Sequence, residues 1–180
     1  MTDELASQIR SACRLEGSFV LRSGQRSTEY FDKYRFEGEP LLLRRVARRM
    51  LTLLPSGAQV LAGLELGGVP IATAMSLEGG LPAVFVRKQA KTHGTRRAVE
   101  GIDVRTKRTV IIEDVISSGG AVADAAKCLR EEGAELIAVI CAIWRGQAAP
   151  AISALPGIQV LAALTAADLR ECAVGCKQDE

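Results

Sequence analysis

Two adjacent carboxylates, Glu113 and Asp114, precede a run of small residues in the stretch VIIEDVISSGGA, which spans residues 110–121. Apolar β-formers come before the acids, and a helical pattern follows from Ala121, so we expect a buried strand, a tight loop and a helix N-terminus. Such a junction presents backbone N–H groups and a helix dipole to an anion. Carboxylates beside it suit hydroxyl groups or a divalent metal. The stretch therefore predicts a sugar-phosphate site.

A second glycine-bearing loop, Leu64-Glu65-Leu66-Gly67-Gly68, lies between a predicted strand (about 59–63) and a predicted helix (about 69–78). Ligands in open α/β sheets bind at the carboxyl ends of strands, so we expect both loops at one edge of the sheet. Neither G-x-G-x-x-G nor G-x-x-x-x-G-K-S/T is present, which argues against a dinucleotide site and a P-loop.

Positive charge is concentrated in RKQAKTHGTRRAVEG, residues 87–101, which also contains His93, the only histidine. A loop of this length in a compact domain is usually functional or disordered. A solvated basic loop is the plain alternative. Because the segment leaves a strand at the same sheet edge, we interpret it as a clamp that closes over a polyanion. Its cations are Arg87, Lys88, Lys91, Arg96 and Arg97.

The N-terminal part predicts a helix over 3–15, ended by Gly17, and then a hairpin with strands at about 18–22 and 28–32. Both tyrosines lie in or just after this hairpin, beside Arg22, Arg26 and Lys33. A cover over one end of the core is the plain interpretation, but aromatic faces beside cations also suit a planar anion.

One further arginine, Arg145, follows a predicted strand (about 136–143) and could bind a carboxylate bidentately. Its neighbour Trp144 is expected to be a packing residue.

The composition indicates one domain of 180 residues, 48% apolar but 4% aromatic, whose core is built from Ala, Val, Leu and Ile. The net charge of +2 is too small to indicate a nucleic-acid binder. A helix starting at Pro40 carries Arg44, Arg45, Arg48 and Arg49, which we interpret as a surface or subunit contact. Five cysteines without a C-x-x-C pair favour reduced thiols in a cytoplasmic protein. No signal peptide or membrane-spanning stretch is expected.

Strand, helix and strand alternate over 59–86 and again from 110 to 143, and a last strand is expected at about 158–163. This rhythm predicts an α/β fold with a central, mostly parallel sheet flanked by helices. Thr165, with Asp168 three positions later, is a possible helix N-cap.

These motifs resemble a known family. VIIEDVISSGGA resembles the phosphoribosyl pyrophosphate (PRPP) signature of type I phosphoribosyltransferases. Arg87-Lys88-x-x-Lys91-x-His93-Gly94 resembles the catalytic loop of orotate phosphoribosyltransferases, and the hairpin with Tyr30-Phe31 resembles their N-terminal substrate hood. The resemblance extends in order from the first helix to Arg145. It implies the type I phosphoribosyltransferase fold over residues 1–180 as a single domain, with a hood at about 1–36 and a flexible catalytic loop at about 87–101.

The activity implied by the resemblance is transfer of 5-phosphoribosyl from PRPP to orotate, giving orotidine 5-phosphate and pyrophosphate in de novo pyrimidine (UMP) biosynthesis. Mg²⁺ would be held mainly through PRPP, with Glu113 and Asp114 near the ribose hydroxyls. A homodimer with shared active sites is implied, in which Lys91 and His93 come from the neighbouring subunit. No nucleic acid and no membrane are expected as partners.

The resemblance also assigns roles by position. The catalytic residues would be Lys91, His93 and Asp114. The PRPP-binding residues would be Arg87, Lys88, Lys91, His93, Glu113, Asp114, Val115, Ile116, Ser117, Ser118, Gly119, Gly120 and Ala121, together with Gly67 and Gly68 beside Leu66 in the pyrophosphate loop. The orotate-binding residues would be Ser117, Arg145, Tyr30, Phe31 and Arg22.

The chain departs from the family pattern at three places. Many relatives have lysine at Arg22 and near Gly67, and an aspartate often occupies the position of Trp144. Two alternatives stay open: a purine or uracil phosphoribosyltransferase, and a non-catalytic PRPP-binding regulator that contacts nucleic acid through the arginine-rich helix.

Overall fold

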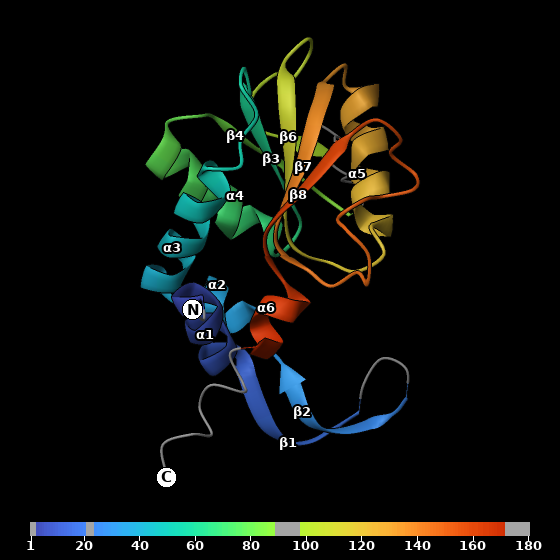
Figure 1. The fold of residues 1–180 in the computed structure, drawn as a ribbon. Helices are drawn as coiled ribbons and strands as arrows, with labels where there is room; N and C mark the ends of the chain where they lie inside the picture. The colour runs from blue at the N-terminus through green and yellow to red at the C-terminus, as the bar shows by residue number, and fades with distance from the viewer. Residues whose placement is uncertain (1–2, 21–23, 89–97, 172–180) are drawn as a thin grey trace.

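The computed structural model describes residues 3–20, 24–88 and 98–171. A six-stranded sheet forms its centre, in the spatial order β5-β4-β3-β6-β7-β8 (Figure 1). Neighbouring strands are parallel except β5, which runs antiparallel to β4. The expected α/β fold with a mostly parallel sheet is confirmed. The strands are β3 (Val60–Leu64), β4 (Ala83–Val86), β5 (Val99–Glu100), β6 (Arg108–Ile116), β7 (Glu135–Trp144) and β8 (Gln159–Thr165).

Helices cover both faces of this sheet, α3 and α4 on one side and α5 on the other (Figure 1). Alternate residues of β6 explain this, because Val110 and Ile112 pack with α3 and α4 while Ile111 packs with α5. Burial on both faces accounts for the near-continuous apolar sequence of β6 and β7. The helices are α3 (Pro40–Leu51), α4 (Gly68–Gly79), α5 (Gly120–Glu131) and α6 (Ala166–Glu171). Thr165 and Asp168 cap α6 reciprocally, as predicted.

The N-terminal region consists of α1 (Glu4–Cys13), a separate hairpin of β1 (Arg14–Val20) and β2 (Arg26–Phe31), and the short α2 (Tyr34–Glu37). The hairpin is as expected, but its first strand begins earlier than predicted. Gly17 lies inside β1 and does not end the helix, because Arg14 to Glu16 already pair with β2 and a register shift follows Glu16. The cross-strand partners, which local periodicity does not reveal, decided this boundary.

The basic segment 87–101 is also shorter as a loop than predicted. Val99 and Glu100 form the edge strand β5, and the Arg87 N–H donates to the Ala98 carbonyl at 2.8 Å. Pairing with β4 imposes this structure on a sequence without an apolar face. Residues 89–97 lie outside the described part.

The four arginines of α3 form ion pairs within the molecule, two of them with the same glutamate. Glu78 of α4 accepts from Arg44 at 2.9 Å and from Arg48 at 2.7 Å. Arg45 pairs with Glu4 at 3.2 Å, and Arg49 pairs with Asp3. These arginines therefore tie α3 to α4 and to the N-terminus. No helix in the described residues is long and apolar enough to cross a membrane.

Candidate active site

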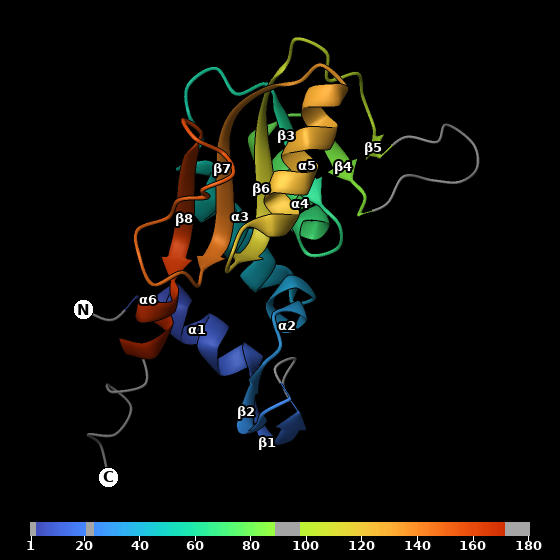
Figure 2. The same cartoon turned by 90° about the vertical axis from the view of Figure 1, so that its right-hand side faces the viewer.

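The carboxyl ends of β7 and β8 point toward α1, α6 and the hairpin (Figure 2). The parallel pairing of β3, β6 and β7 brings the loops that follow them to this same edge. The sequence-predicted strand-end loops are therefore neighbours in space, although they are far apart in the chain.

The loop after β6 surrounds a cavity of about 200 Å³, lined by Glu113 and by residues 115–122. Gly119 has a φ of 78° and precedes α5 without a side-chain cap. A Cβ there would lie 2.8 Å from the Ile152 side chain, so a glycine is needed for both conformation and space. The uncapped N–H groups of α5 and the small side chains of Ser117 and Ser118 make this cavity suitable for a phosphate.

The two adjacent acids have different environments. Glu113 lines the phosphate-loop cavity, whereas the Asp114 side chain is completely buried. Asp114 accepts a hydrogen bond from the Val115 N–H and forms an ion pair with Lys33 Nζ. A Cβ on Gly67 would overlap the Asp114 carboxylate, so this side chain lies directly beneath the glycine loop after β3.

Burial and neighbouring charges separate the pKa values of this acidic cluster. Burial by itself would raise the pKa of Asp114, but hydrogen bonds with Glu113 and Lys33 hold that pKa below its ordinary value. Burial and the Asp114 carboxylate raise the pKa of Glu113 to about 9. The same two causes raise the pKa of Glu37, in α2, to about 8. Asp114 is therefore the acid of this cluster that keeps its negative charge most readily.

The loop after β3 is connected to the start of the basic segment. The Lys88 N–H donates to Glu65 Oε2 at 3.0 Å, and the Glu65–Leu66 peptide bond is cis. A cavity of about 320 Å³ is lined by Glu65, Arg87, Lys88 and Ala121, among others. Two of the predicted diphosphate-binding cations therefore share a cavity with the first turn of α5.

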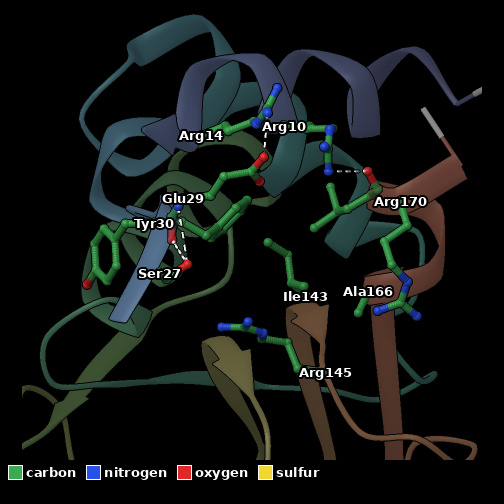
Figure 3. Close-up of a pocket in the computed structure, with 11 residues that line it drawn as sticks. Arg10, Arg14, Ser27, Glu29, Tyr30, Ile143, Arg145, Ala166 and Arg170 are labelled. Atoms are coloured by element: carbon green, nitrogen blue, oxygen red, sulfur yellow. Dashed lines mark hydrogen bonds and ion pairs between the residues drawn. The ribbon is translucent and has the colours of Figure 1, made fainter. Parts of the chain in front are cut away.

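A third cavity, of about 370 Å³, lies between the hairpin and the end of β7. Tyr30, Phe31 and Arg145, which the sequence predicted to form a base site, all line it. Figure 3 shows Arg145 extending from β7 toward the hairpin strand that carries Ser27. The Arg145 N–H donates to the Ile116 carbonyl at 2.8 Å, which places this cavity next to the phosphate loop.

Trp144 packs as predicted, 5% exposed, with its Nε1–H donating to the Ala148 carbonyl at 2.8 Å. Three predicted site residues, Arg22, Lys91 and His93, lie outside the described residues.

In the described ranges no group of three or more His, Cys, Asp or Glu side chains is arranged to hold a metal. Mg²⁺ commonly takes one or two carboxylates and completes its shell with water and substrate phosphates. Glu113 and Asp114 supply two adjacent carboxyl groups, the number that such a substrate-bound metal commonly takes.

Several residues of the buried cluster around Asp114 and of the base cavity were not predicted as site residues. Lys33 was noted only as a charge near the hairpin, and Glu37 gave no signal, because their partners are distant in the sequence. The base cavity is also lined by Arg10, Arg14, Ser27, Glu29 and Arg170.

Comparisons with known proteins agree with this geometry. Residues 40–157 match the phosphoribosyl transferase domain family. An orotate phosphoribosyltransferase of Nocardioides sp. is 55% identical over 165 residues, which cover 92% of each chain. The structure of Mycobacterium tuberculosis orotate phosphoribosyltransferase superimposes with a TM-score of 0.79 at 33% identity, covering 92% of this chain and 97% of that one. The structure of the same enzyme in complex with PRPP superimposes with a TM-score of 0.76 at 28% identity, covering 93% of this chain and 97% of that one.

Proposed function

This chain belongs to the phosphoribosyltransferase family, and we propose that it is an orotate phosphoribosyltransferase, which converts orotate and PRPP into orotidine 5-phosphate and pyrophosphate. The fold is the one that the motif resemblance implied. The relative from Nocardioides sp. is similar over 92% of the chain.

The observation that carries the choice of substrate is the position of the Arg145 cavity. It adjoins the phosphate loop through the 2.8 Å hydrogen bond between Arg145 and Ile116. A pyrimidine bearing a carboxylate has a planar ring for Phe31 and an anion for Arg145. A ribose 5-phosphate in the neighbouring loop would then place its anomeric carbon between the two cavities.

The chemistry follows from charge. Displacement at an anomeric carbon passes through an oxocarbenium-like state, as in glycoside hydrolysis. Mg²⁺ bound with PRPP would neutralise charge on the departing diphosphate. Arg87, Lys88, Lys91 and His93 would stabilise the same charge as it grows, and Asp114 and Glu113 would serve the ribose side. No covalent nucleophile is required, since these groups act by electrostatic stabilisation of the transition state.

We assign Lys91 and His93 to the active site of the neighbouring subunit in a homodimer, and we place the reaction in the cytoplasm. Support for the location comes from the free thiols of Cys13, Cys128 and Cys141, which suit a reducing compartment.

The test is a direct assay of purified protein with PRPP and Mg²⁺ against orotate, uracil, hypoxanthine and xanthine. We expect orotate absorbance to fall only when both PRPP and Mg²⁺ are present. Turnover of uracil or a purine in its place would identify the alternative enzyme. PRPP binding without turnover of any base, together with a salt-dependent interaction with RNA or DNA, would identify the regulator.

A further inference from the structure

Two segments that are distant from Asp114 in the sequence, α2 with its preceding residue and the loop after β3, meet at its carboxylate. Lys33 comes from the connection between the hairpin and α2, and its Nζ pairs with Oδ2. Glu37 ends α2, is 7% exposed, and directs Oε1 toward the same position. Gly67, in the loop after β3, covers both oxygens: a Cβ there would overlap Asp114 and lie 2.9 Å from Glu37 Oε1.

Lys33 supplies the positive charge in this cluster. Three carboxyl groups, Glu37, Glu113 and Asp114, lie close together in a buried space, where they cannot all be ionised. The Lys33 side chain is 33% exposed, and its ammonium pairs with Asp114, whose side chain is 0% exposed. Its Nζ also lies 5.1 Å from the centre of the Tyr34 ring, which helps to fix its position.

Oε1 of Glu37 and Oδ2 of Asp114 are both buried and have no hydrogen-bond donor in the described residues other than the Lys33 ion pair. The Asp114 carboxylate oxygen therefore depends on the Lys33 ammonium as its partner.

The loop above this cluster is the proposed diphosphate loop, and its residues Glu65 to Gly68 include no cation. A buried carboxylate beneath it would repel a polyanion unless its charge is compensated. Lys33 compensates that charge through its ion pair with Asp114.

We propose that Lys33 is a positioning residue for the transfer reaction: its ion pair fixes Asp114 beneath Gly67 and so joins the N-terminal hairpin to the diphosphate loop. This inference rests on the proposed function. Lys33 acts through Asp114 and not on the base, so its loss should affect PRPP and leave orotate binding nearly unchanged.

The test compares Lys33→Met with Lys33→Arg and with Arg35→Met, a control that removes the same charge from an exposed position of α2. We expect Lys33→Met to lower kcat/KM for PRPP by about 10- to 100-fold, as small misplacements in active sites do, with KM for orotate within about 3-fold. Lys33→Arg should recover most of the loss, and Arg35→Met should stay within about 2-fold of wild type.

A double-mutant cycle separates action through Asp114 from direct contact with substrate. In the Asp114→Asn background, Lys33→Met should change Mg²⁺-PRPP affinity, measured by calorimetry, by less than about 3-fold, because the partner charge is already gone. Thermal unfolding of each variant checks that it is folded. The double variant, Lys33→Met with Asp114→Asn, carries neither charge of the pair and so leaves no unpaired buried charge.

Four results would each overturn the inference. The effects in the cycle could be additive, or Arg35→Met could lose as much activity as Lys33→Met. The KM for orotate alone could rise, or Lys33→Arg could be as slow as Lys33→Met. If wild-type protein binds Mg²⁺-PRPP but does not turn over orotate, the proposed function fails instead. The calorimetric cycle still tests Lys33 in that case.

Discussion

Arg145 contributes a guanidinium to the base cavity without an ion-pair partner in the described ranges, so its charge is available to a ligand. Arg145→Ala should raise KM for orotate by about 10- to 100-fold, the typical loss of a hydrogen bond between charged groups, while KM for PRPP changes little. Steady-state kinetics with each substrate varied in turn measures both constants.

Arg170 gives this prediction a matched control, because it lines the same cavity from α6. If Arg170→Ala raises KM for orotate as much as Arg145→Ala, the overall charge of the cavity selects the carboxylate and Arg145 has no special role. An equal rise in KM for PRPP would remove Arg145 from the base site.

The buried carboxyl group of Glu37 should make the free energy of unfolding depend on pH. Its pKa in the folded protein is about 8, above the value of 4.5 for an ordinary glutamate, because it is buried beside Asp114. The unfolded chain therefore loses this proton first as the pH rises. The contribution of Glu37 to stability is greatest below pH 4.5, decreases from there to about pH 8, and is constant above.

Glu37→Gln cannot titrate, so its free energy of unfolding relative to wild type should rise between pH 5 and pH 8, on the order of 1–3 kcal/mol. Urea unfolding at several pH values measures this difference. A difference that is constant with pH would show that Glu37 titrates normally in the folded protein.

At the level of elements, close packing of α4 on β3 positions the diphosphate loop between them. A Cβ on Gly63 would lie 2.6 Å from the Gly68 carbonyl oxygen and 2.8 Å from Ala72 Cβ. Backbone cannot yield as a side chain does, so Gly63→Ala should lower the free energy of unfolding by about 1–3 kcal/mol and reduce activity by displacing Gly67 and Gly68.

Gly79→Ala, at the other end of α4, is the matched control. Its Cβ would lie 2.6 Å from a methyl carbon of Leu51, which can change rotamer. Its effects on thermal unfolding and kcat should be clearly smaller. Equal effects would mean that β3 and α4 separate more easily than their packing suggests.

For the whole molecule, we proposed that each active site takes Lys91 from the neighbouring subunit. Mixing two defective variants should then restore a calculable fraction of the activity. Lys91→Ala should lose at least about 100-fold in kcat, since it removes stabilisation of the leaving group. When Lys91→Ala and Arg145→Ala subunits are mixed and allowed to exchange, half of the dimers are mixed, and each contains one intact site. At orotate concentrations well below the raised KM of Arg145→Ala, we expect recovery of roughly a quarter of wild-type activity.

Mass measurement of the mixed dimers confirms that the subunits have exchanged. If activity then stays at the level of the separate variants, Lys91 acts in the site of its own chain. Lys91→Ala mixed with Lys91→Ala is the control for the exchange procedure itself.

The sequence by itself indicated the order of the main strands and helices and a candidate phosphate loop. Periodicity predicted β3, α4, β7 and β8 to within a few residues, because local patterns of burial define these elements. The chemistry of VIIEDVISSGGA is also local, since a strand, a tight turn and a helix N-terminus are contiguous in the chain. Arg145, Tyr30 and Phe31 could be chosen from residue type and strand position, and they do line one cavity.

Tertiary structure alone decided the extent of β1 and β5, because pairing with β2 and β4 outweighs weak local preferences. It also decided that Glu113 and Asp114, adjacent in sequence, have different environments. Asp114 meets Lys33 and Glu37 from one distant segment and Gly67 from another, and no local pattern records a contact over such separations. The chain sequence predicts which groups can do chemistry, whereas the packing of distant segments sets their charges and their partners.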